Sequence, residues 1–396
     1  MRHLALTAAV LALVAGTAAG GGLDLSGFVA GETRWFPDEP AYPGQFDGLQ
    51  SSLVLQPEFR YRTSNRRHTF RLTPFLRLDD RDDERTHFDL REAYWLAVAG
   101  DVEVLVGVNT VFWGVTESRH LIDVVNQVDY VEDVDGEGKL GQPMVRLSWQ
   151  RDWGRLEAFA LVGFREMTLP GPHGRLRLPL PITDDADFPD GRSDLDAALR
   201  WSHYLGDFDL GLHFFHGMGR EPGFRPVTGA DGLPALQPFY NRINQLGMDG
   251  QWTRDAWLWK LEWLVREGDG DTFAAAVMGF EYTLYQLGGG NADLGLLGEF
   301  LYDGRDDTAS ATFFDRDVFA GARLALNDVH DTTVLAGAVV DARDGSTVAR
   351  LEFERRLSNR FKLEIEGRFF LGVADDNAVA FLRQDSFLNL RLAYGL

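Results

Sequence analysis

The chain has 396 residues, no cysteine and a formal net charge of −21 at pH 7. This excess of carboxylates disfavours nucleic acid as a partner, because phosphates attract lysine and arginine. The lack of cysteine is compatible with an exported protein that is not cross-linked by disulfide bonds.

The first 22 residues have the pattern of a secretory leader. Arg2 and His3 form a short basic start, an apolar run extends to Val14, and a stretch of small residues follows. The apolar run is too short for a membrane-spanning helix. We therefore expect residues 1–22 to be a cleaved signal peptide and residues 23–396 to form one exported domain.

The first segments after the leader alternate between polar and apolar residues, which is the two-residue period of a strand. The pattern predicts strands over residues 25–36, 53–62 and 70–78. Pro57 and Pro74 cannot donate to a ladder of hydrogen bonds. We expect them to lie at bulges.

The stretch from residue 88 to residue 126 predicts a hairpin of two long strands. Two runs rich in Val, Leu, Trp and Tyr flank the tight turn Gly100-Asp101. Both arms are long enough to cross a bilayer as tilted strands of ~9–11 residues. The second arm runs into Trp113-Gly114 and a long polar connection, residues 115–142. A short turn on one side and a long loop on the other are typical of a transmembrane barrel.

The same alternation continues to the end of the chain, interrupted by long connections at residues 165–193 and 217–238. The further predicted strands cover residues 145–150, 156–164, 194–201, 208–215, 257–266, 273–286, 292–302, 318–327, 332–343, 349–354, 361–369 and 388–396. The count is about 18 strands, with 16 as the fallback, and single-chain bacterial barrels have even numbers.

Short turns follow the even-numbered strands and long loops the odd-numbered ones. This phase predicts an all-β transmembrane antiparallel barrel in the outer membrane of a Gram-negative bacterium, with both termini in the periplasm. The alternatives are a soluble β-sandwich and a β-solenoid. Neither needs a face of arginine and glutamate opposite a wholly apolar face in nearly every strand.

In lipid, charges are expensive, so we expect the apolar face to point outwards and the charged face to line the lumen. Trp257, Trp259 and Trp263 then supply lipid and interface contacts. The candidate pore-lining residues are Arg60, Arg62, Arg71, Arg77, Glu92, Arg146, Arg200, Arg323, Arg350 and Arg368, and Arg356 and Arg391 share their face.

Two interpretations of the lumen arginines stay open. They could line a path for an anionic solute, since arginine binds carboxylates and sulfates in bidentate fashion. They could instead form a structural ladder, each paired with a facing Glu or Asp. Glu92 interrupts an apolar phase of its strand, so this strand either turns Glu92 inwards, which we favour, or places it near a rim.

The connection over residues 115–142 is long enough to fold into the pore as a constriction. Its core has apolar residues at helical spacing, which predicts a short inserted helix near residues 120–130. The residues expected to meet solute are Glu117, Arg119, Asp123 and Asn126. The alternative is an external loop that packs against its neighbours.

Several motifs in the first third of the chain resemble those of a known family. Leu90-Arg91-Glu92-Ala93-Tyr94, Trp113-Gly114 and Asp123-Val124-Val125-Asn126 resemble a Gram-negative outer-membrane barrel family of unknown function. The chain is also distantly similar to the alginate-export porins. The sequence departs from the family pattern at Val108-Asn109 and at Gln127. The resemblance implies an outer-membrane channel and names no substrate.

Acidic tracts lie in the predicted loops, at residues 79–84, 132–137, 184–190, 269–271 and 303–307. They are either solvated loops or sites of diffuse Ca²⁺ or Mg²⁺ binding beside lipopolysaccharide. The tract near Asp133 lacks the first and twelfth ligands of an EF-hand, so no metal site is predicted. Signatures such as G-x-S-x-G and Walker A are absent from the sequence, and no serine lies at a suitable offset from a histidine. We therefore expect neither an enzyme nor a cofactor.

The sequence leaves two functions open. The first is a porin-like channel that passes or exports polar or anionic solutes through the outer membrane. The second is a plugged barrel with a structural or assembly role, serving a periplasmic or envelope-transport partner. In both, the expected partners include outer-membrane lipid and lipopolysaccharide, and the oligomeric state stays open.

Overall fold

The structure is a computed structural model that describes residues 21–306 and 308–396. The predicted leader lies outside these residues, apart from its last two. The strands are β1 (Gly22–Trp35), β2 (Leu49–Arg62), β3 (His68–Asp79), β4 (His87–Ala99), β5 (Val102–Asn109), β6 (Gln142–Arg151), β7 (Gly154–Val162), β8 (Leu195–Leu205), β9 (Phe208–Met218), β10 (Gly223–Thr228), β11 (Pro234–Phe239), β12 (Arg242–Arg254), β13 (Trp257–Glu267), β14 (Phe273–Leu284), β15 (Asp293–Asp303), β16 (Arg316–Ala325), β17 (Thr333–Asp341), β18 (Thr347–Arg356), β19 (Phe361–Leu371) and β20 (Phe387–Gly395). Two 3₁₀ turns, η1 (Leu287–Gly289) and η2 (Ala380–Leu382), lie in connections.

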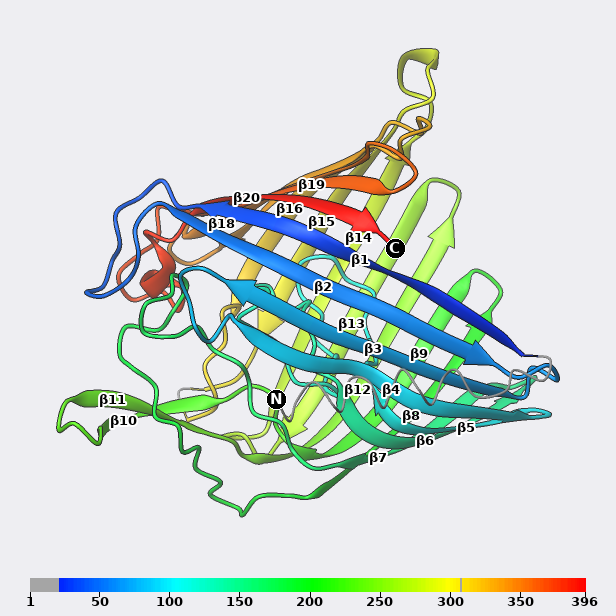
Figure 1. Cartoon of the computed structure of the whole chain (residues 1–396), viewed down its shortest axis with the longest axis horizontal. Helices are drawn as coiled ribbons and strands as arrows, with labels where there is room; N and C mark the ends of the chain where they lie inside the picture. The colour runs from blue at the N-terminus through cyan, green and yellow to red at the C-terminus, as the bar shows by residue number, and fades with distance from the viewer. Residues whose placement is uncertain (1–20, 307) are drawn as a thin grey trace, which may run out of the picture.

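Eighteen of these strands form one closed antiparallel barrel (Figure 1). Each barrel strand pairs with its neighbours along the chain, and β9 pairs with β12. The barrel closes because β1 pairs with β20 as well as with β2. Closure leaves no free sheet edge, which a β-structure in lipid requires. The predicted architecture and the count of about 18 strands are confirmed, although no predicted segment covers β12.

The two ends of the barrel differ in their connections. Tight turns join β4 to β5, β6 to β7, β8 to β9 and β12 to β13 at one end, where β1 also begins and β20 ends. We call this the short-turn end. The other end, which we call the long-loop end, carries most of the long connections, although those after β13 and β17 are short. Which end faces the periplasm stays a prediction.

The outer face of the barrel is apolar. Large apolar side chains exposed on successive strands include Leu55, Phe70, Val106, Leu147, Leu212, Trp259, Met278, Phe300, Val318 and Leu392. A soluble protein rarely exposes so large an apolar surface. Trp252 and Trp259 are paired neighbours near the β12–β13 turn, and Trp257 stacks on Trp259 with centroids 5.5 Å apart. This arrangement is that of a barrel embedded in lipid with an aromatic girdle towards its short-turn end.

A β-bulge in β4 explains the irregular phase of that strand. The β3–β4 register shifts between Thr73 and Pro74, so that Arg91 is the extra residue on β4. Arg91 and Glu92 consequently both point into the lumen, while Phe88 before the bulge and Trp95 after it are exposed on the outer face. Glu92 therefore faces inwards, the alternative favoured by the sequence.

The two prolines lie at irregularities, as expected. Pro74 follows the register shift between β3 and β4. Pro57 lies in a stretch of β2 that does not pair with β3. Proline has no N–H to donate, and at both positions the ladder of hydrogen bonds between β2, β3 and β4 is already interrupted.

One loop contains structure that the sequence did not indicate. The predicted long connection 217–238 contains β10 and β11, which pair with each other in a separate two-stranded sheet. This hairpin projects from the long-loop end of the barrel (Figure 1). Among residues 21–306 and 308–396, no helix is long and apolar enough to cross a membrane.

Candidate channel lumen and constriction

The connection between β5 and β6, residues 110–141, folds into the barrel, and we call it the inner loop (Figure 1). Trp113 and Gly114 make its first bend, where Gly114 has a φ of +147°. A Cβ atom on Gly114 would lie 3.0 Å from Oε1 of Glu262 on β13, so the bend brings backbone and wall into close approach.

Glu262 anchors the inner loop to the wall. Its Oε1 accepts hydrogen bonds from the backbone N–H of Val115 at 2.7 Å and of Thr116 at 2.9 Å, and from the Thr116 hydroxyl at 2.6 Å. Its Oε2 accepts one from the N–H of Ile122 at 3.2 Å. Glu262 is fully buried. A buried carboxylate of this kind is stable because several donors replace its lost hydration.

Three further strands hold the same part of the loop. The carboxylate of Glu299 on β15 accepts the backbone N–H groups of Glu117 and Ser118, at 2.7 and 2.8 Å. The carboxylate of Glu117 contacts Arg323 on β16 and Arg350 on β18, each at 2.6 Å. Burial raises the pKa of Glu117, but these two guanidinium groups outweigh it and hold the pKa below its ordinary value.

Apolar side chains of the inner loop pack on the inside of the barrel. Ile122, Val124 and Val125 join a buried cluster with inward-facing residues of β5 to β9 and β12. Leu121 joins a second cluster with residues of β13 to β17. The expectation that the lumen face is the charged set throughout is therefore wrong for this side of the barrel. The wall is apolar there because the loop covers it.

The predicted inserted helix is not present. Residues 120–130 form turns and bends, with two isolated bridges, from Val128 to Lys139 and from Asp129 to Thr168. Within this stretch the N–H of Val128 bonds to the side-chain oxygen of Gln127, and the N–H of Asp129 bonds to the carbonyl of Gly138, so neither makes a helical hydrogen bond. Helical spacing of the apolar residues instead reflects packing against two different parts of the wall.

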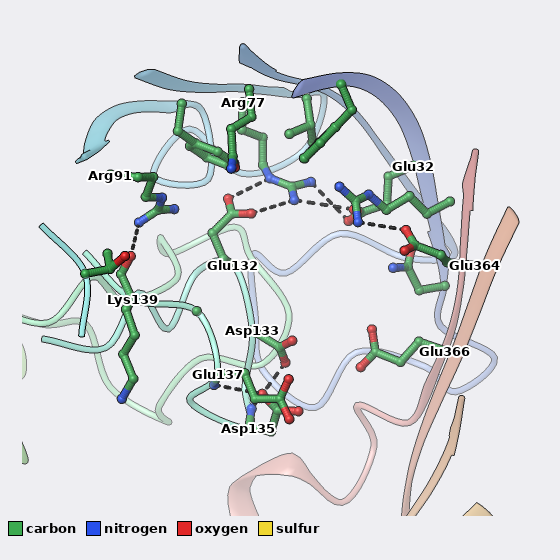
Figure 2. Close-up of a pocket in the computed structure, with 18 of the residues that line it drawn as sticks. Glu32, Arg77, Arg91, Glu132, Asp133, Asp135, Glu137, Lys139, Glu364 and Glu366 are labelled. Carbon is green, nitrogen blue, oxygen red and sulfur yellow. Dashed lines mark hydrogen bonds and ion pairs between the residues drawn. The ribbon is translucent and has the colours of Figure 1, made fainter. Parts of the chain in front are cut away.

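Residues 129–139 cross the lumen from one part of the wall to another, and we call them the constriction segment. At one side Glu132 forms a bidentate pair with Arg77 of β3, with both contacts at 2.6 Å. Arg91 of β4 bonds to the Lys139 carbonyl (Figure 2). Arg91 also bonds to the carboxylate of Asp129. At the other side Asp135 pairs with Arg368 of β19.

A buried cluster of opposite charges supports the first of these contacts. Glu32 of β1 lies 3.0 Å from Arg77 and 2.7 Å from Arg85. Arg85 also lies 3.2 Å from Asp79. All of these side chains are nearly inaccessible to solvent, so the pairing of charges is what makes their burial tolerable. Arg77 is thus a fixed part of the wall, linked both to Glu32 and to the constriction segment.

A cavity with a volume of about 760 Å³ borders the constriction segment, and we call it the lumen cavity. It lies between the segment and the arc of wall made by β18, β19, β20, β1, β2, β3 and β4. Figure 2 shows Glu364 and Glu366 on one wall of it, opposite Arg77 and Arg91. Ten carboxylate and seven cationic side chains line it, which is an excess of three negative charges when all of them are ionised.

A second cavity, of about 360 Å³, lies at the long-loop end, and we call it the vestibule. Its walls come from the inner loop and from the connections β7–β8, β9–β10, β15–β16 and β19–β20. Asp135 and Lys139 line both cavities. The constriction segment therefore separates the two spaces.

The structure distributes the predicted pore-lining residues over several environments. Arg71, Arg77, Glu92 and Arg368 line the lumen cavity. Arg60 and Arg62 lie near the short-turn end of β2, and Arg146, Arg200, Arg323 and Arg350 lie on other parts of the wall. Ion pairs join Arg60 to Asp24, Arg71 to Glu92, Arg146 to Glu157, Arg200 to Asp249, Arg356 to Asp331 and Arg391 to Glu364. This distribution resembles the structural ladder more than a row of free arginines.

The four residues expected to meet solute at the constriction also separate. Arg119 and Asp123 line the vestibule, whereas Glu117 is held against the wall. For Asn126 the expectation is wrong, because its side chain is fully buried and bonds to the backbone of Val111, Asn109 and Leu140. Asn126 fixes the path of the inner loop and does not face a cavity.

Sequence reasoning missed the residues that form the constriction segment. The tract Glu132–Asp133–Val134–Asp135–Gly136–Glu137 was assigned to solvated loops or diffuse cation binding, yet its carboxylates meet wall arginines inside the barrel. One feature of the sequence could have indicated this segment, because its carboxylates, Asp133, Asp135 and Glu137, alternate with Val134 and Gly136. Among the described residues, no group of three or more His, Asp or Glu side chains is placed to hold a metal ion.

The constriction segment concentrates carboxylates whose ionisation is perturbed. The charge of Asp135, burial and the charge of Glu352 raise the pKa of Glu137 to about 7. Burial and the neighbouring Asp135 raise the pKa of Asp133 well above its ordinary value. For Asp135, the Arg368 guanidinium outweighs burial and lowers the pKa. The charge of this segment therefore changes near neutral pH.

A comparison with solved structures finds porins at low identity and low structural similarity. An engineered porin of Rh. blastica is 13% identical, with a TM-score of 0.46 over 95% of this chain and 100% of that chain. OprB of Pseudomonas putida at high pH is 10% identical, with a TM-score of 0.45 over 95% of this chain and 94% of that chain. No family model matches the sequence, and no curated protein matches it. The motif resemblances to an uncharacterised barrel family and to alginate-export porins are thus not confirmed.

Proposed function

We propose that the chain forms an outer-membrane channel for small polar solutes, with residues 129–139 as its constriction, and that it is not an enzyme. One observation carries the proposal. The lumen cavity and the vestibule lie on opposite sides of the same short segment and share Asp135 and Lys139. A modest displacement of that segment would join them. The apolar outer face supports a position in lipid.

The exposure of the lining charges favours cations over the anionic solutes expected from the sequence. The side chains of Glu352 and Glu354 are 36% and 50% exposed, whereas those of the lining arginines Arg71 and Arg391 are 28% and 26% exposed. Side chains of both signs form ion pairs, but the carboxylates are more exposed and more numerous, so they dominate the potential that a solute meets. We infer a weak preference for cations.

Deleting residues 133–137 tests the proposed constriction. The deletion leaves Tyr130, Val131 and Glu132 to connect Asp129 with Gly138, whose backbone groups are hydrogen-bonded at 2.8 Å. It also retains the Glu132–Arg77 pair. We expect a severalfold higher single-channel conductance in planar bilayers, because the lumen cavity and the vestibule then merge.

The matched control deletes residues 229–233 at the tip of the β10–β11 hairpin, which lies outside the barrel. This deletion should leave the conductance at the wild-type value. If the 133–137 deletion folds as a barrel and its conductance is unchanged, these residues are not the constriction.

The plugged barrel remains the second candidate, and one feature favours it. Ion pairs to Arg77, Arg91 and Arg368 fasten the constriction segment at both sides of the lumen. A barrel that conducts only after residues 133–137 are deleted would support this role. A wild-type protein that conducts would support the channel.

A further inference from the structure

The vestibule has the composition of a small-molecule site. Its volume of about 360 Å³ lies within the range of known ligand pockets, which are mostly apolar with a few placed polar groups. Apolar side chains from five separate segments converge on it, among them Val128, Leu169, Ile182, Phe224, Phe314 and Phe381. The lumen cavity, in contrast, is lined mainly by charged side chains.

The charged side chains on the vestibule wall already have partners. These pairs are Arg119 with Asp303 at 3.0 Å, Lys139 with Asp123 at 3.3 Å, Arg220 with Asp196 at 3.2 Å, Arg266 with Glu221 at 2.5 Å, and Asp135 with Arg368. An ionised ligand would have to lose its hydration without gaining a free counter-charge. The wall therefore favours an uncharged ligand.

Four polar atoms on residues that line the vestibule have no hydrogen-bond partner among the described residues. Two of them, Asp123 Oδ2 and Arg220 Nη1, belong to charged groups that are already in ion pairs, and the other two belong to Tyr130 and His120. The hydroxyl of Tyr130 and Nδ1 of His120 are buried and have no hydrogen-bond partner among the described residues. Both side chains line the vestibule. A buried tyrosine hydroxyl normally finds a partner, because leaving it unsatisfied costs free energy. A ligand hydroxyl would supply the missing bond.

We propose that the vestibule binds small uncharged molecules with an apolar body, an aromatic ring or a short alkyl chain, and one hydroxyl group. The body packs among the apolar loop residues and the hydroxyl bonds to Tyr130. The bound molecule lies against the constriction segment on its long-loop side. Binding at this site does not depend on conductance, so it can be measured even if the barrel passes no current.

Isothermal titration calorimetry with 4-propylphenol tests the proposal on the full-length mature barrel in lipid nanodiscs, which avoids competition from detergent. We expect saturable binding at one site, above the signal of empty nanodiscs. Phe381→Asp should weaken this binding at least about tenfold, since it replaces a large apolar contact by a charge. The matched control is Leu233→Asp at the exposed β10–β11 tip, which should bind as the wild type does.

A second variant separates the hydroxyl contact from the apolar contacts. Tyr130→Phe should weaken binding of 4-propylphenol about threefold to tenfold and leave binding of propylbenzene unchanged. The anion 4-propylbenzoate should bind more weakly than the phenol to the wild type. Absence of saturable binding, equal affinity in Phe381→Asp, or tighter binding of the benzoate would overturn the proposal.

Discussion

Single carboxylates decide where the inner loop lies. Glu262 accepts hydrogen bonds from the N–H groups of Val115, Thr116 and Ile122, and Glu299 accepts those of Glu117 and Ser118. These N–H groups have no helix or sheet partner, so the two carboxylates replace secondary structure. The position of the loop inside the barrel depends on them.

Glu262→Ala should destabilise the barrel by about 3 kcal/mol or more, because at least three buried N–H groups lose their acceptor. Glu262→Gln keeps one acceptor oxygen and should cost less. Urea unfolding in lipid vesicles measures both changes. A cost below about 1 kcal/mol for Glu262→Ala would show that the loop finds other partners.

Glu137 should make ion selectivity depend on pH. Its pKa of about 7 lies above the ordinary value of 4.5, so the group is uncharged and the segment is held more firmly below pH 7. As pH rises through 7, Glu137 ionises, repels Asp135 and Glu352, and adds a negative charge to the lumen cavity. Reversal potentials in a KCl gradient should therefore show a stronger preference for K⁺ at pH 8 than at pH 6. Glu137→Gln should remove most of this increase, whereas an unchanged pH response would assign it to another group.

At the scale of the element, successive side chains of each strand point in turn to the lipid and to the lumen. On β2, Leu55 is exposed on the outer face, and the next residue, Gln56, lines the lumen cavity. The bulge at Arg91 shows how one extra residue resets this alternation in β4. The strand then keeps Glu92 out of the lipid.

Adjacent substitutions on β2 should therefore have opposite consequences. Leu55→Arg places a charge on the lipid face and should cost about 2–4 kcal/mol of folding free energy in vesicles. Gln56→Arg extends into the lumen cavity and should change stability by less than about 1 kcal/mol. It should also reduce the preference for cations in reversal-potential measurements. Equal costs for the two variants would contradict the assigned faces.

At the scale of the whole molecule, the two unlike ends of the barrel predict its orientation in the membrane. Short turns and both described ends of the chain share one end, and in bacterial barrels short turns face the periplasm. Because the chain has no cysteine, single cysteines report accessibility without background. A membrane-impermeant maleimide should label Gly232→Cys at the long-loop end of intact cells and should not label Gly206→Cys. Disrupting the outer membrane should expose both, and the reverse labelling pattern would invert the orientation.

The sequence by itself determined the barrel and its apolar outer face. Alternating residues specify which side of each strand meets lipid, and the short-turn and long-loop phase specifies the order of pairing. The sequence also indicated that residues 115–142 are long enough to enter the lumen. These features are local, so they can be read from neighbouring residues.

Only the tertiary structure decided what fills the lumen. The partners of the inner loop, such as Glu262, Glu299 and Arg368, lie more than a hundred residues away along the chain, and no local pattern links them to the loop. The acidic tract forms the constriction segment because its carboxylates pair with arginines on two sides of the lumen. The expected helix is absent because Leu121 packs on one part of the apolar wall and Ile122, Val124 and Val125 pack on another, which a single helix face would not allow.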